Sequence, residues 1–224
     1  PAGRARAAAW DGASADNAWY NSSASAFTIQ TPAQLAGLAK LVNDGTDSFL
    51  GKTVTLQADI DLGNHEWKPI GYGHVPLSLT ISNTFEGVFD GNGHVVSNLK
   101  NEVHHTTNDD TTYWFGFTGL FGLLDSTGTI KNLTVAGVVD VTSNNNPLPP
   151  GVSHLQGYAG GIVGYSAGRV ENCVNRATVK GNYGTGGIAG CLESGSIEKC
   201  LNEGDVYHSN GIFAGVGGIA GLVS

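Results

Sequence analysis

The densest group of candidate metal ligands in this sequence is a short polar run. It contains His104, His105, Asp109 and Asp110. Imidazole and carboxylate groups together suit zinc, nickel or copper. A solvated insertion between regular segments is the simpler interpretation, and such insertions often carry binding residues. We therefore expect these four side chains to contact a partner, and we expect no metal and no cofactor.

Aromatic side chains follow this run directly. Tyr113, Trp114 and Phe115 stand in a row, and Phe117 comes two positions later. Aromatic faces pack well against the apolar faces of sugar rings. The three consecutive rings beside polar groups therefore complete a hypothetical binding site for a glycan. The alternative is that this segment packs on the core or covers its flank, and both interpretations stay open at this point.

Three aspartates, Asp59, Asp61 and Asp90, lie near the regular segments. Paired carboxylates catalyse glycoside hydrolysis, so a polysaccharide-active enzyme is the alternative function. Asp also binds backbone N–H groups in turns, and the glycines after Asp90 favour a tight turn there. His65 opens a zinc-protease pattern, but Pro69 stands where that pattern needs its second His.

The chain has three cysteines and lacks the closely spaced pairs of a thiolate zinc site. Cys173 and Cys200 occupy equivalent places in two repeats, at a separation that would permit a disulfide. Free, buried thiols are the favoured interpretation, because thiols pack as small hydrophobes. Cys191 is expected in a variable turn, as the one cysteine with reactivity.

Composition and charge exclude several functions. The chain has 224 residues, 34 of them Gly, with 13% charged residues and a net charge of −8. Nucleic-acid binding needs a basic surface, and membrane insertion needs about 20 consecutive apolar residues, so we expect neither. Residues 1–9 resemble the end of a secretion signal that lacks its apolar core.

Internal repeats organise the sequence. A signature with the pattern Gly-x-x-Gly occupies residues 119–122, 161–164, 187–190 and 218–221, and a second block occupies 129–133, 169–173 and 196–200. A divergent early copy is expected at 87–90 and 96–99. The signatures are spaced by 42, 26 and 31 residues, which suits one coil of a parallel β-solenoid.

In such a solenoid, equivalent residues stack about 4.8 Å apart. The alignment predicts these columns: Val96, Ile130, Val170 and Ile197; Leu99, Leu133, Cys173 and Cys200; Val139, Val179 and Val206; and Asn98, Asn132 and Asn172. Stacked amides can hydrogen-bond along the axis. Charge is scarce because a charge repeated in every coil would lie beside its own kind, which is destabilising.

The N-terminal part has a different pattern. Thr31 and Pro32 are suited to begin a helix, Leu and Val recur on one face, and Gly45 ends it. A first strand is expected at 53–60. We interpret residues 1–50 as a lead-in and helical cap, with Trp10 and Trp19 packed beneath it, and residues 51–224 as coils with insertions near 101–118 and 142–158. We expect further repeats or another domain after Ser224.

These repeats resemble the GLUG motif of bacterial surface proteins. The resemblance rests on Gly-Ile-Val/Ala-Gly followed by Val-Glu-Asn-Cys, and on the segments 27–35, 58–62, 67–71 and 85–94. It implies an all-β fold, a right-handed parallel β-helix, in a secreted or cell-surface protein. GLUG regions also occur beside the catalytic domain of IgA-specific metalloendopeptidases.

The resemblance and the residues together favour a non-catalytic function. We expect an extracellular adhesin or stalk that presents its insertions to a host glycan or glycoprotein. A polysaccharide-active hydrolase or lyase, with its site on one β-helix face, is the alternative.

Overall fold

The structure, a computed structural model, describes residues 8–72, 83–102, 115–141, 156–208 and 215–224. Within these residues the chain forms β-strands and a single helix, α1 (Pro32–Asn43). The strands make four sheets, which we name A to D. The predicted all-β class is confirmed.

In sheets A, C and D the strands lie in chain order, whereas one long strand of sheet B pairs with two shorter strands of the next layer. Sheet A contains β1 (Ala26–Ile29), β2 (Thr53–Leu56), β4 (Val88–Asp90), β8 (Thr129–Lys131), β12 (Arg169–Glu171) and β17 (Ser196–Glu198). Sheet B contains β3 (Ile60–Asp61), β5 (Val95–Glu102), β9 (Thr134–Asp140), β13 (Val174–Asn175), β14 (Thr178–Gly181), β18 (Leu201–Asn202) and β19 (Val206–His208).

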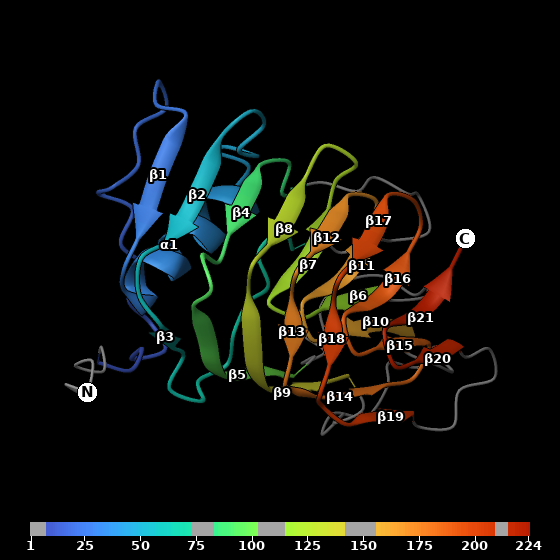
Figure 1. The fold of residues 1–224 in the computed structure, drawn as a ribbon. Coiled ribbons are helices and arrows are strands. Elements are labelled where there is room, and N and C mark those ends of the chain that lie inside the picture. The colour runs from blue at the N-terminus through green and yellow to red at the C-terminus, as the bar shows by residue number, and fades with distance from the viewer. Residues whose placement is uncertain (1–7, 73–82, 103–114, 142–155, 209–214) are drawn as a thin grey trace, which may run out of the picture.

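The other two sheets have four strands each. Sheet C contains β7 (Phe121–Leu124), β11 (Val163–Ser166), β16 (Ala189–Leu192) and β21 (Ala220–Val223). Sheet D contains β6 (Phe115–Thr118), β10 (Gln156–Gly160), β15 (Gly184–Gly186) and β20 (Gly215–Gly217). All strand pairs among the described residues are parallel. Successive repeats therefore form stacked layers, from the blue N-terminal end to the red C-terminal end of Figure 1.

Helix α1 forms as the sequence predicts. The Thr31 side chain accepts a hydrogen bond from Gln34 N, Pro32 occupies the first turn, and Gly45 has a φ of 68° after the last turn. The apolar face of α1 is buried in the core with β1 and β2. Strand β1 precedes the segment 53–60, so the first strand lies earlier than predicted and sheet A already begins within the expected cap.

Glycines of the signature allow backbone to pack on backbone. A Cβ atom at Gly164 would lie 2.5 Å from Thr118 N, and one at Gly190 would lie 2.5 Å from Ala159 N. Each glycine belongs to a strand of sheet C and contacts sheet D of the preceding layer. The last glycine of the signature therefore sets how closely sheets C and D approach.

The first glycine of the signature leaves room for a buried amide. A Cβ atom at Gly161 would overlap Asn175 Oδ1. Asn175 is fully buried, and its Nδ2 donates to Asn202 Oδ1 in the next layer at 2.8 Å. This amide ladder is absent from the sequence-based columns. It connects sheet B to the signature turn in each of these layers.

The register of β4 corrects the first predicted column. Phe89, rather than Val96, stacks with Ile130. Val96 instead pairs with Ile60 and Val135 in sheet B. The reason is that the tight turn after β4 stacks on the turn after β8, with the N–H of residue 91 donating to the carbonyl of residue 131 at 2.8 Å.

The same shift corrects the predicted Leu and Asn columns. Leu99 lies opposite Gly137, and Asn98 Nδ2 donates to Asp61 at 2.7 Å. The rest of the amide column is confirmed, since Asn172 Nδ2 donates to Asn132 Oδ1 at 2.7 Å.

The early copy of the signature is also elsewhere than predicted. Residues 87–90 belong to sheet A, beside the second blocks. Ile70 instead forms a parallel bridge with Phe121, and Gly122 N donates to Ile70 O at 2.8 Å. The segment 67–71 therefore occupies the place of the signature one layer earlier, and Trp67 fills the core beside it.

Candidate functional site

Most of the predicted binding residues lie outside the described residues. These are His104, His105, Asp109, Asp110, Tyr113 and Trp114. Phe115 is described, as the first residue of β6, and its register partner is Gln156, the first residue of β10. The predicted insertions 101–118 and 142–158 therefore already contain strand residues at their ends, and the strands β6 and β10 are neighbours in sheet D.

The strands that precede the insertions are neighbours as well. Strand β5 ends at Glu102, whose register partner is Asp140 at the end of β9. Segments 103–114 and 142–155 therefore both connect the same edge of sheet B to the same edge of sheet D. Segment 209–214 joins β19 to β20 and so also connects sheet B to sheet D. In the layer between, residues 182 and 183 make this connection.

An aromatic group lies beside this edge, on the side of sheets C and D that faces away from the main core. We name it the tyrosine cluster: Phe117 of β6, Tyr158 of β10, Tyr165 of β11 and Tyr183 before β15. The Phe117 and Tyr158 rings are stacked, with centroids 5.7 Å apart and planes 2° apart. Tyr158 meets Tyr165 and Tyr183 edge to face, with centroid distances of 5.9 and 5.2 Å.

The strand pattern explains why these rings point away from the core. Alternate residues of a strand face opposite sides, and Ala159 beside Tyr158 is fully buried in the main core. Phe117 and Leu123 form a separate apolar cluster against Tyr158 and Tyr165. Gly184 takes the place of a side chain next to Tyr158, and a Cβ atom there would lie 2.7 Å from the Tyr158 ring.

The cluster presents neutral phenol groups. Burial, followed by the neighbouring Tyr183, raises the pKa of Tyr158. Burial, followed by a hydrogen bond to Glu193, raises the pKa of Tyr165. The three tyrosines are half-buried and Glu193 is exposed. Half-buried rings with hydroxyl groups and one carboxylate are a combination that can pack on sugar rings and hydrogen-bond their hydroxyls.

Sequence reasoning found only part of this cluster. Phe117 ends the aromatic run, and Tyr158 ends the second insertion. Tyr165 and Tyr183 were missed. Tyr165 could have been found in the sequence, because it is the aromatic residue at a repeat position where the neighbouring layers have Leu123 and Cys191.

The aspartates considered for glycoside hydrolysis hold turns together. Asp61 accepts hydrogen bonds from Gly63 N at 2.9 Å and from Asn98 at 2.7 Å. Asp59 lies 3.0 Å from the His94 ring. Asp90 is partly desolvated, which opposes ionisation, but hydrogen bonds from Asn132 and from the backbone of residue 92 outweigh that effect and lower its pKa. A carboxyl group in this state is a poor general acid.

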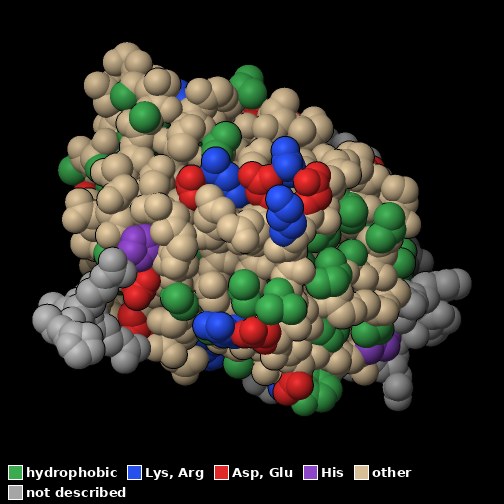
Figure 2. Space-filling view, in the orientation of Figure 1, with side chains coloured by type: hydrophobic (Ala, Val, Ile, Leu, Met, Phe, Trp, Pro, Cys, Tyr) green, Lys and Arg blue, Asp and Glu red, His purple; other side chains and the backbone are tan. Residues whose placement is uncertain are grey.

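A band of charged side chains crosses the outer face of sheet A (Figure 2). Asp90, Lys131, Glu171 and Glu198 share one column of the register. Lys131 lies 3.6 Å from Asp90, and Arg169 lies 2.6 Å from Glu171 and 3.1 Å from Glu198. The two adjacent glutamates are therefore bridged by one guanidinium group, and the band serves the stacking of layers.

Cys191 corrects another prediction. It lies in strand β16 and is buried, rather than in a variable turn. Burial raises its pKa to about 11, with a further contribution from Glu193. Cys191 is therefore a poor nucleophile at neutral pH.

The fold and its repeats define a class of protein: an all-β repeat protein whose parallel strands stack in layers through a glycine signature. The family model of the GLUG motif matches residues 156–180. The chain carries the GLUG motif, in β10, β11, β12, β13 and the start of β14.

The chain is also similar to parts of two known proteins. The chain is 32% identical to halomucin of Haloquadratum walsbyi over 167 residues, which is 73% of this chain and 2% of halomucin. It is 27% identical to a protein of Evansella cellulosilytica, described as a Gly-rich membrane protein, over 111 residues, which is 50% of this chain and 11% of that protein. The chain thus spans a small part of both relatives.

A solved structure shows a related fold. It is the crystal structure of a candidate immunoglobulin A1 protease from Bacteroides ovatus, with a TM-score of 0.55 and 22% identity, covering 88% of this chain and 62% of that one. Among the residues that our structure describes, helix α1 is too short to cross a bilayer, and we find no helix that would.

Proposed function

We propose that this chain is a right-handed parallel β-helix region of a bacterial surface or secreted protein, and that it binds a host glycan or glycoprotein without catalysis. The tyrosine cluster beside the shared edge of the insertions is the observation that carries this proposal. The GLUG motif and the similarity to halomucin and to a Gly-rich membrane protein support a surface location.

The arrangement of the edge favours binding over a purely structural role. Two predicted insertions leave sheet B together and enter sheet D together. Phe115 stands two residues before Phe117 of the tyrosine cluster, so the first insertion leads directly into it. Loops held by rigid strands are the usual place for recognition.

The charge of the protein narrows the ligand class. The net charge is −8, and Glu193 is exposed beside the cluster. Anionic polysaccharides would be repelled. We therefore favour neutral or amino sugars, whose apolar ring faces fit the tyrosine rings and whose hydroxyl or amino groups can bind Glu193.

A glycan array with the purified chain tests this proposal, followed by titration of the best neutral sugar. The substitution Tyr158→Ala removes the central ring and is expected to weaken binding about fivefold, since one aromatic contact contributes roughly 1 kcal/mol. Tyr158→Phe keeps the ring and should retain most of the affinity.

The matched control is Tyr207→Ala, which removes a tyrosine that is 52% exposed on β19, outside the cluster. Its binding should equal that of the parent chain. Array signals at background, or equal losses in Tyr158→Ala and Tyr207→Ala, would contradict the proposal. Release of reducing ends from a polysaccharide would instead support the alternative function, a polysaccharide-active enzyme.

A further inference from the structure

Cys173 and Cys200 form a matched pair of thiols in neighbouring layers. Val170 pairs with Ile197, and Val174 pairs with Leu201. The register therefore places Cys173 opposite Cys200, between these two pairs. Neighbouring strands lie about 4.8 Å apart, a Cα separation within the range that a disulfide can span.

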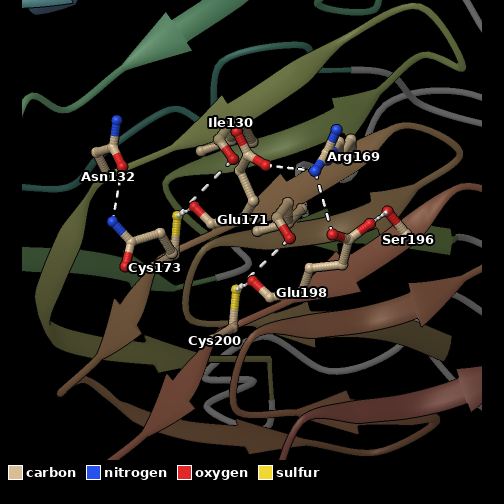
Figure 3. A network of polar contacts seen from close by, with 10 residues as sticks. Ile130, Asn132, Arg169, Glu171, Cys173, Ser196, Glu198 and Cys200 are labelled. Atoms are coloured by element: carbon tan, nitrogen blue, oxygen red, sulfur yellow. Dashed lines mark hydrogen bonds and ion pairs between the residues drawn. The ribbon is translucent and has the colours of Figure 1, made fainter.

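The two thiols point in the same direction and have the same surroundings. Cys173 Sγ lies 3.3 Å from Glu171 O and 3.8 Å from Ile130 O. Cys200 Sγ lies 3.3 Å from Glu198 O and 3.6 Å from Val170 O. Figure 3 shows this repetition, with each sulfur beside a carbonyl of its own layer and one of the layer before.

The pair differs in access to solvent. Cys173 is fully buried, whereas Cys200 is half-buried and packs at the edge of the core. A hydrogen bond from the Cys173 thiol lowers the pKa of Cys200 to about 7. The same hydrogen bond, together with burial, raises the pKa of Cys173. Of the two thiols, Cys200 is therefore the one that forms the thiolate, the reactive form, more readily.

We propose that Cys173 and Cys200 are an oxidation site, which a low-molecular-weight disulfide converts into a disulfide bond between adjacent layers. The Cys200 thiolate attacks one sulfur of the oxidant, forms a mixed disulfide and releases one thiolate. Cys173 then attacks the Cys200 sulfur while its proton passes to the departing thiolate, which leaves as the second small thiol. Two protein thiols are oxidised and one small disulfide is reduced to two thiols.

The product would tie together two neighbouring layers, the one that contains β12 and the one that contains β17. It would join the segment between β12 and β13 to the segment between β17 and β18 and would close a loop of 28 residues, counted from 173 to 200. A cross-link of this kind restricts the unfolded chain. Oxidation is expected to raise the midpoint of thermal unfolding, most strongly for the C-terminal layers.

The test is incubation of the folded chain with oxidised glutathione at pH 7.5, followed by alkylation of free thiols under denaturing conditions and peptide mapping. We expect the peptides of Cys173 and Cys200 to be linked and Cys191 to be alkylated. The control Cys191→Ser should form the same link, because Cys191 pairs with Tyr165 and Leu222 instead.

Two variants separate the steps. Cys173→Ser should trap the intermediate as one glutathione on Cys200. Cys200→Ser should remain unmodified, because the remaining thiols are buried. All three thiols staying alkylatable in the parent chain, a link that includes Cys191, or a stable glutathione adduct in place of a link would overturn the proposal.

Discussion

The two ends of the stack are built differently. At the N-terminal end, helix α1 and a group of aromatic rings cover the layers: Trp19 meets Phe27 at a centroid distance of 5.4 Å and Phe49 at 6.2 Å. At the C-terminal end, apolar side chains are exposed: Leu201 by 50%, Val216 by 50% and Val223 by 74%. Large side chains cover the N-terminal layers, whereas the C-terminal strands of this sequence carry exposed apolar residues.

The core changes in the same direction. Its largest fully buried side chains belong to the early layers: Phe49, Trp67, Phe85, Phe89 and Phe121. The later layers use Ala159, Cys173, Ala177 and Ala189 in the interior. In the early layers, large aromatic side chains fill the core. In the later layers, small side chains let one layer stack closely on the next. Repeat proteins generally need such a distinct terminal cap.

The largest expected effect comes from removing a ring at the N-terminal end. Phe49 is fully buried and meets Trp19, Tyr20, Phe27 and Phe85. Phe49→Ala should lower the free energy of unfolding by about 3–5 kcal/mol. Urea unfolding followed by tryptophan fluorescence measures this loss. Tyr207→Ala at the other end should change it by less than about 0.5 kcal/mol, and equal effects would remove the distinction between the ends.

A smaller effect is expected from one methyl group placed in an inner or an outer layer. Gly161 and Gly218 hold the same position of the signature, but a Cβ atom at Gly161 would overlap Asn175, whereas at Gly218 nothing lies within 4 Å. Gly161→Ala should cost about 1–3 kcal/mol of stability through overpacking. Gly218→Ala should be close to neutral. Thermal unfolding of the two variants measures the loss of stability in each. A loss in Gly218→Ala similar to that in Gly161→Ala would contradict the argument that stacked layers leave no room at Gly161.

The smallest effect concerns acid sensitivity of the N-terminal end. Burial opposes ionisation of Asp47, but hydrogen bonds from Lys52, Tyr20 and the backbone of Phe49 outweigh it, so its pKa is lowered below the ordinary 3.8. Its stabilising contribution is complete above pH 3.8 and is lost as the pH falls through the lower, folded-state value. Unfolding curves at pH 6 and pH 3 should therefore differ less in Asp47→Asn than in the parent chain. An unchanged difference would show that other carboxylates dominate.

The sequence predicts the elements whose signals are local or repeated. Helix α1 follows from Thr31, Pro32 and Gly45, and the stacking of Ile130 on Val170 follows from two closely similar blocks. The early register does not follow, because Phe89 and Ile70 take the places of repeat positions in segments that lack the Gly-x-x-Gly pattern. Tertiary packing of large rings, which sequence similarity does not record, decides that register.

Only part of the candidate site could be predicted from the sequence. The aromatic run and the insertions are visible as departures from the repeat, and Phe115 does begin a strand of the sheet edge concerned. Tyr165 joins the cluster only because sheets C and D fold against each other at Gly164, and Tyr183 joins it because it precedes β15, the neighbour of β10 in sheet D. Such contacts between different sheets have no counterpart in the spacing of residues along the chain.

The shared edge between sheets B and D has a consequence for spacing. Layer positions are fixed by the glycine contacts and by the Asn175–Asn202 ladder, so the length of a connection at this edge is free to change without moving the layers. Binding segments placed there in successive layers would stand at multiples of about 4.8 Å. The spacing between layers would then set the distance between neighbouring ligands in multivalent binding.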